Sequence, residues 1–122
     1  MANEYAHLHG NSGGNFLDYW KVLYEYDMLA GGFIWEWVDQ TLTKQLPDGR
    51  RVFVYGGDFG DVPNDGNFCI KGMVTADRKI YPNYSEIQKV YQPAWFRMIS
   101  DKPLVIEVTN HQLATNLSEY KF

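Results

Sequence analysis

Hydrophobic and polar residues alternate with a helical period in the first third of the chain. Five apolar residues recur at that spacing, namely Phe16, Tyr19, Trp20, Leu23 and Tyr26. The spacing predicts an amphipathic helix that Asn15 caps and that ends at the glycine pair of Ala30-Gly31-Gly32. The next stretch, FIWEWVDQ, is rich in β-forming residues on both faces and predicts a buried strand.

Three further segments have distinct patterns. TLTKQLPDGRRVFVY predicts a β-hairpin whose turn is Pro47-Asp48-Gly49. The glycine- and aspartate-rich stretch GGDFGDVPNDGNFCIKG also carries aromatic residues, so it predicts a long but ordered loop. NYSEIQKVY predicts a short helix, with Asn83 as its cap, Glu86 completing a box-like capping pattern, and Pro93 ending it.

The pattern changes again at Trp95. WFRMIS, LVIEVTN and LSEYKF alternate like strands, and the change in character marks a domain boundary near residue 93. Before it, the order strand, helix, strand is typical of a βαβ unit, which places the first part in the α/β class. Since both ends of the chain fall within predicted strands, we expect the chain to be a piece of a longer protein.

Composition narrows the classes of partner. The net charge is −4 without a basic stripe, which argues against nucleic acid, and no apolar run reaches the ~20 residues of a membrane span. The single cysteine, Cys69, excludes an internal disulfide framework and leaves a cytoplasmic and a periplasmic location equally open. Aromatic residues make up 16% of the chain, and they suit either core packing or stacking on sugars.

Candidate chemistry begins with Glu4, near the predicted carboxyl end of the first strand. At that rim of an α/β barrel a carboxylate can act as a nucleophile or as an acid/base, although a surface acid is the ordinary alternative. Tyr5 could hydrogen-bond a carboxylate, and His7 or His9 could donate to a substrate hydroxyl. Local hydrogen bonds are the ordinary role of such histidines.

Two tryptophans and two acids lie on the next strand. Trp35 and Trp37 alternate, so their rings are predicted to face opposite sides, and core packing is the alternative for each. Glu36 and Asp39 are further acid candidates. Cleaving a glycosidic bond normally takes two carboxyl groups, about 5–5.5 Å apart for retention of configuration or about 6.5–9.5 Å apart for inversion. The spacing does not select the partner of Glu4.

Three sequence blocks, NEYAHLHGNSGGNFLDYW, GGFIWEWVDQ and YGGDFGDVPNDGNFCIKGMVTADR, closely resemble family 2 glycoside hydrolases of the β-galactosidase type. The resemblance is strong from residue 2 to about residue 93. It implies a (β/α)8 TIM barrel flanked by β-sandwich domains. Residues 1–93 would be the last βα units of the barrel, and residues 94–122 the first strands of an immunoglobulin-like sandwich.

The resemblance also assigns roles to residues. Glu4 matches the nucleophile that forms the glycosyl-enzyme intermediate, Tyr5 matches a residue that orients it, and His7 matches one that contacts sugar hydroxyls. Trp35 matches the aromatic platform under the galactose. The family's acid/base glutamate and its main magnesium ligands have no counterpart among the 122 residues.

Two metal ions are implied by the resemblance, and one of them conflicts with the sequence. Phe68 matches a residue whose backbone carbonyl binds sodium beside the 6-hydroxyl of the sugar. Asn64 falls on a position associated with a secondary magnesium site. The sodium site of the family also uses an asparagine three residues after the phenylalanine, where this chain has Lys71. The Lys71 ammonium could therefore replace sodium and contact the 6-hydroxyl itself.

These features together predict a fragment of a retaining β-galactosidase, which acts on β-galactosides in the complete protein and is inactive as an isolated chain. Part of a barrel leaves open sheet edges and an apolar face, so we also expect self-association or a homo-oligomer. Two alternatives stay open, a carbohydrate-binding module without catalytic activity and a structural fragment that complements a truncated partner.

Overall fold

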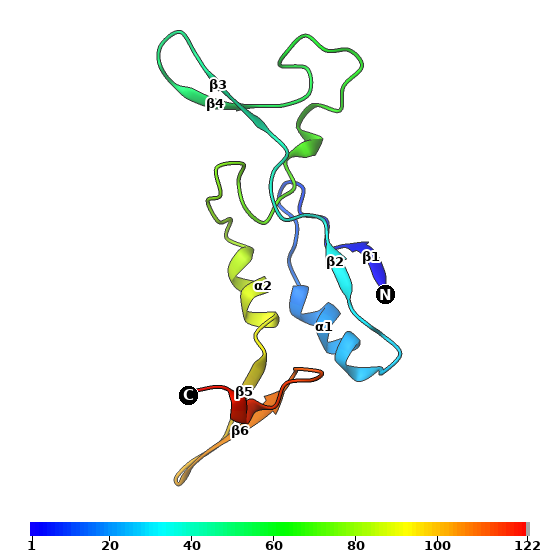
Figure 1. Cartoon of the computed structure of the whole chain (residues 1–122), viewed down its shortest axis with the longest axis vertical. Helices are drawn as coiled ribbons and strands as arrows, with labels where there is room; N and C mark the ends of the chain where they lie inside the picture. The colour runs from blue at the N-terminus through cyan, green and yellow to red at the C-terminus, as the bar shows by residue number, and fades with distance from the viewer. Residues whose placement is uncertain (122) are drawn as a thin grey trace. The chain divides into compact units, whose positions relative to one another are not determined.

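The structure of the chain is a computed structural model that describes residues 1–121 (Figure 1). The elements in chain order are β1 (Ala2–Tyr5), α1 (Phe16–Glu25), β2 (Gly32–Ile34), β3 (Leu42–Gln45), β4 (Arg51–Val54), η1 (Gly66–Cys69), α2 (Tyr84–Val90), β5 (Ala94–Asp101), β6 (Leu104–Asn110) and η2 (Leu117–Glu119). Within residues 1–121 the strands form three two-stranded sheets and close no barrel. Two compact units separate along the chain, Met1–Ile87 and a second that begins at Gln88. The division predicted at residue 93 stays a prediction.

The first unit contains the predicted βαβ arrangement. Strand β1 pairs in parallel with β2, and helix α1 connects them (Figure 1). The backbone ladder continues past both strands, because Trp35 N donates to the carbonyl of Tyr5 at 3.1 Å and Leu8 N donates to that of Trp35 at 3.1 Å. Residues 2–8 and 32–35 therefore lie side by side.

A third extended segment borders the other edge of β2. Glu36 N donates to the carbonyl of Lys71 at 3.0 Å, and Met73 N donates to the carbonyl of Glu36 at 2.9 Å. Val38 and Val74 form a parallel bridge. Residues 71–74 are all buried. Three extended segments, 2–8, 32–38 and 71–74, are therefore neighbours in the backbone hydrogen bonding.

Helix α1 differs from its prediction at both ends. Asn15 has φ of 57° and its side chain makes no capping hydrogen bond, so the predicted cap is wrong. The backbone N–H of Leu17 donates instead to Glu86 Oε1 at 3.2 Å. The helix ends at Glu25, before the predicted glycine end, because Tyr26 is extended and Leu29 N donates to the Tyr26 carbonyl in a turn.

The predicted hairpin is confirmed as β3 and β4. The two strands pair antiparallel, and Leu46 N donates to the carbonyl of Arg50 at 2.8 Å to close the turn. Gly49 has φ of +85°, which glycine adopts without the steric cost of a side chain. The following long loop contains the short helix η1.

Helix α2 is also confirmed, but its predicted cap is not. Asn83 Oδ1 is buried and, within the described residues, has no hydrogen-bond partner. Its side chain lies against Gly13, where an added Cβ would come within 3.1 Å of Asn83 Nδ2. Glu86 serves α1 rather than completing a capping box for α2.

The second unit holds the antiparallel pair of β5 and β6, which confirms two of the three predicted strands. The third prediction, LSEYKF, is wrong over its described part. Leu117–Glu119 forms a 3₁₀ helix, because Asn116 and Glu119 make a capping box that competes with extended backbone. The last residue of that stretch, Phe122, lies outside the described residues. Across residues 1–121, no helix has the length and apolar character needed to cross a membrane.

Candidate active site

Glu4 lies near the carboxyl end of β1, as predicted. Trp35 follows the carboxyl end of β2, and because the two strands run parallel, both residues belong to the same edge of the sheet. Glu4 is exposed. Within residues 1–121 no hydrogen bond or ion pair engages its carboxylate, which leaves both oxygens available to a ligand.

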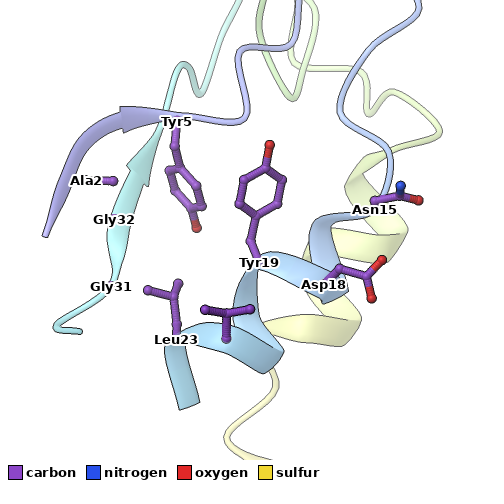
Figure 2. A pocket seen from close by; sticks show the side chains of 9 residues that line it. Ala2, Tyr5, Asn15, Asp18, Tyr19, Leu23, Gly31 and Gly32 are labelled. Carbon is purple, nitrogen blue, oxygen red and sulfur yellow. The ribbon is translucent and has the colours of Figure 1, made fainter. Parts of the chain in front are cut away.

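Tyr5, the next residue, belongs to the packing of helix α1. Its hydroxyl accepts a hydrogen bond from Trp20 Nε1 at 2.9 Å, and its ring lies edge-on to Tyr19 at 5.7 Å between ring centroids. The two tyrosine rings lie side by side (Figure 2). Both line a hollow of about 520 Å³, which Leu23 also lines. Of the predicted site residues only Tyr5 lines this hollow, and its role toward Glu4 stays a prediction.

Three other candidate residues, His7, His9 and Lys71, contact the ring of Phe68, and Lys71 also contacts Trp35. Phe68 stacks with His7 at 5.4 Å between ring centroids and 25° between ring planes, and it contacts His9 at 5.5 Å. Lys71 Nζ lies 4.8 Å from the centroid of Phe68 and 5.6 Å from that of Trp35. These five residues, His7, His9, Trp35, Phe68 and Lys71, are referred to below as the aromatic cluster.

Lys71 is buried, with 8% of its surface exposed, although lysine is rarely buried without a partner. The nearest carboxylate oxygen is Glu36 Oε1, 4.0 Å from Nζ. That oxygen is itself buried and, in the described chain, accepts no hydrogen bond. The other carboxylate oxygen of Glu36 accepts from Gln40 Nε2 at 2.9 Å.

The two tryptophans have different neighbours, in line with the predicted alternation. Trp35 contacts Lys71, whereas Trp37 contacts the ring of Tyr84 at 6.1 Å in an edge-on arrangement. The peptide bond between Trp35 and Glu36 is cis. Trp35 is 37% exposed, so part of its ring is open to a ligand.

Asp39, the other acid candidate on this strand, is buried and hydrogen-bonded to neighbouring residues. It is 6% exposed and accepts hydrogen bonds from Gly72 N at 2.7 Å and from the hydroxyl of Tyr81 at 2.6 Å. The pKa of the Tyr81 hydroxyl is raised to about 12, first because burial disfavours the phenolate and then because of the hydrogen bond and the charge of Asp39. The Asp39 carboxylate thus joins the backbone of Gly72 to the side chain of Tyr81.

Asn64 uses both ends of its side-chain amide inside its own loop. Nδ2 donates to the carbonyl of Asp61 at 2.8 Å, and Oδ1 accepts from Gly66 N at 3.0 Å. Among residues 1–121, no group of three or more His, Cys, Asp or Glu residues could hold a metal ion. The side chain of Asn64 is thus engaged within its own loop, and its role in a magnesium site stays a prediction.

The sequence predicted a role for the carbonyl of Phe68 but not for its ring, and it named Glu36 only as a further acid candidate. The ring of Phe68 touches three members of the cluster, and Glu36 is the acid closest to Lys71. The position of Glu36 in the sequence did point to the site, because Glu36 directly follows the tryptophan of the predicted platform. No signal in the sequence pointed to the contacts of the Phe68 ring with His7 and His9, because these residues are about 60 positions apart in the chain.

Comparison with known proteins gives the family. The family model for the TIM barrel domain of glycosyl hydrolases family 2 matches residues 1–96. A protein named beta-galactosidase from Priestia megaterium is 45% identical over 119 residues, which cover 98% of this chain and 12% of that protein. Proteins of the same name from Yersinia enterocolitica and Klebsiella pneumoniae are 47% identical over 113 and 110 residues, covering 93% and 90% of the chain and 11% of each protein. The chain thus spans about a tenth of the length of these relatives, and it belongs to the glycosyl hydrolases of family 2.

Proposed function

We propose that the chain is part of a retaining β-galactosidase, which hydrolyses terminal β-D-galactosides through a covalent glycosyl-enzyme intermediate. The name shared by the relatives supports the substrate class. The observation that carries the proposal is the exposed, unpaired carboxylate of Glu4 at the same strand edge as Trp35 of the aromatic cluster.

In this mechanism Glu4 attacks the anomeric carbon and forms the bond to it as the bond to the aglycone oxygen breaks. A general acid from outside the chain gives its proton to the leaving oxygen. The same group then takes a proton from water, which attacks the anomeric carbon and releases Glu4 as a carboxylate. Two displacements on the same carbon retain its configuration.

The aromatic cluster is the proposed sugar-binding surface. The partly exposed ring of Trp35 offers a flat platform to the C–H face of galactose. His7, stacked on Phe68, can donate a hydrogen bond to a sugar hydroxyl, and so can the ammonium of Lys71. Tyr5 would act at one remove, by orienting Glu4.

The metal ions of the family enter no step. The carbonyl of Phe68 and the side chain of Asn64 are the only positions of this chain to which the resemblance assigns ions. Asn64 is engaged in its loop, and the Lys71 ammonium lies over the ring of Phe68, the residue whose carbonyl is expected to bind sodium. We therefore propose a sugar site of side chains alone within this segment.

The fold of the complete protein is part of the same proposal. Residues 1–93 would supply the last βα units of a TIM barrel, and residues 94–122 the first strands of a β-sandwich. A structural fragment that complements a truncated partner is the alternative for the isolated chain. Its support is the number of large exposed apolar side chains, which include Phe33, Trp37, Phe96 and Met98.

Labelling with a mechanism-based 2-deoxy-2-fluoro-β-galactoside tests the proposal. In the full-length protein, peptide mass spectrometry should find one covalent sugar, on Glu4. The Glu4→Gln variant should take up no label and should lose about 10⁴-fold or more in kcat, as expected when a nucleophile is removed. Labelling of Glu36, Asp39 or no residue at all would refute the assignment.

A further inference from the structure

The buried ammonium of Lys71 has fewer partners than its charge calls for. A lysine ammonium carries three N–H donors. Within the described residues Nζ makes no hydrogen bond, since the nearest carboxylate oxygen, Glu36 Oε1, is 4.0 Å away. The rings of Phe68 and Trp35 offer cation–π contact but accept few hydrogen bonds. The N–H donors of the Lys71 ammonium are therefore available to a ligand that can accept a hydrogen bond.

Glu36 is held in a fixed orientation from three sides. Its N–H donates to the carbonyl of Lys71, its carbonyl accepts from Met73 N, and its Oε2 accepts from Gln40 Nε2. Only Oε1 is left unsatisfied, and that oxygen is the one that lies toward Nζ. The carboxylate thus attracts the ammonium from a defined place without consuming its donors in a short hydrogen bond.

We infer that Glu36 is a positioning residue, which holds the Lys71 ammonium as a built-in cation for a sugar hydroxyl in place of the sodium ion that the family implies. The inference rests on the proposed β-galactosidase function. It extends that function by giving the site a second acidic residue, whose task is to aim Lys71 rather than to react.

A sodium ion does not fit beside this ammonium. Sodium requires several oxygen ligands, whereas Nζ faces two aromatic rings and one carboxylate oxygen. A second cation next to a buried ammonium would be repelled, because charges interact strongly where water is excluded.

The first test needs no variant. Hydrolysis of a nitrophenyl β-D-galactopyranoside by the full-length protein is measured in sodium, potassium and choline chloride at equal ionic strength. The kcat/KM should agree within about twofold in the three salts, because the cation is part of the chain. Activation by sodium of about tenfold or more over choline would overturn the inference.

The second test compares two substrates. Glu36→Gln keeps the size of the side chain but removes its charge, so Lys71 is no longer aimed. We expect KM for the galactoside to rise about tenfold with kcat within about threefold, and the matched 6-deoxy substrate, a β-D-fucopyranoside, to lose about twofold or less. Lys71→Met should likewise weaken binding of the galactoside more than binding of the 6-deoxy substrate. Lys71→Asn should make activity dependent on sodium.

The control is Glu107→Gln, which removes the acid of the surface ion pair with Arg97. This variant should leave KM and kcat for the galactoside unchanged, and also the activity on the 6-deoxy substrate. Melting temperatures of the variants separate misfolding from a local effect, and the salt comparison holds whether or not any variant folds. Equal losses on both substrates in Glu36→Gln would overturn the positioning role. Failure of the wild-type protein to hydrolyse any β-galactoside would instead refute the proposed function.

Discussion

The carboxylate of Glu86, on helix α2, accepts a hydrogen bond from the backbone N–H of Leu17, in the first turn of helix α1. The two residues are 69 positions apart in the sequence. The first N–H groups of a helix lack partners inside the helix, and Asn15 does not supply one. Glu86 therefore does the work of a cap, with a negative charge at the positive end of the helix dipole.

Loss of this cap should lower stability. Glu86→Ala should reduce the free energy of unfolding of the full-length protein's barrel domain by about 1 kcal/mol, and Glu86→Gln by about half as much, since the amide keeps an acceptor but not the charge. Urea denaturation measures the difference. Glu25→Gln, at the exposed end of the same helix, is the control and should change stability little. An equal effect of Glu86→Ala and Glu25→Gln would contradict the capping role.

Gly72 should tolerate no side chain. A Cβ at this position would overlap the backbone of Val38, Asp39 and Val74, none of which can move without breaking the ladder. Gly72→Ala should therefore destabilise the domain by about 3 kcal/mol or more, or prevent folding. Gly14→Ala is the matched control, because a Cβ there meets nothing within 4 Å and the residue does not have a positive φ. Soluble yield and thermal melting distinguish the two variants.

The hydrogen bond between Tyr81 and Asp39 should give stability a dependence on alkaline pH. The pKa of Tyr81 is raised from 10.0 to about 12 by burial and by Asp39. Its contribution is complete below pH 10, and it is lost as pH rises from 10 toward 12, because only the unfolded state ionises in that window. Tyr81→Phe should cost about 1–3 kcal/mol at pH 8, and the gap to wild type should narrow between pH 10 and 12. A gap that does not change with pH would refute the assignment.

The ring of Phe68 should matter for binding more than for chemistry. It contacts both His7 and Lys71, so Phe68→Leu should loosen two groups of the sugar-binding surface. In the full-length protein KM should rise about fivefold, the equivalent of about 1 kcal/mol of cation–π and stacking contact, with kcat little changed. Phe59→Leu is the control, since that ring is exposed and contacts only Lys44 among the cations described. A change in kcat without a change in KM would place Phe68 in a different role.

The isolated chain should associate and should be inactive. Exposed apolar side chains on both units, such as Phe33 and Met98, favour association in water. We expect dimers or larger species by light scattering at concentrations of about 10 μM, and no nitrophenol from a β-galactoside reporter. A monomer with turnover that Glu4→Gln abolishes would contradict both expectations.

The sequence predicted the elements more reliably than their ends. The hairpin of β3 and β4 follows from the local turn at Pro47-Asp48-Gly49, and β5 and β6 follow from their strand-like patterns of apolar and polar residues. The cap of α1 could not be predicted, because Glu86 is distant in sequence. The error at Leu117–Glu119 was of a different kind, since a capping box between Asn116 and Glu119 is visible in the sequence.

Individual residues of the candidate site could be predicted from the sequence, but the contacts between them could not. Glu4 could be named because it lies near the carboxyl end of the predicted first strand, whereas the platform role of Trp35 was implied by the resemblance, and both roles stay predictions. The relation of Glu36 to Lys71 was hidden, because it depends on the register between segments 32–38 and 71–74. Register between parallel segments is a property of tertiary packing, and one residue of slippage would reverse it.

The register between segments 32–38 and 71–74 determines where the chain can accept insertions and deletions. The long loop between β4 and segment 71–74 meets that segment only at its end, so a residue added near Val62, whose side chain is 88% exposed, leaves the backbone ladder in step. A residue added between Cys69 and Lys71 would carry the Lys71 side chain to the opposite face of the sheet, and one added between Lys71 and Val74 would put these two residues out of register with each other. Natural insertions and deletions in homologues should therefore gather in the loop and be absent from the five positions that follow Cys69.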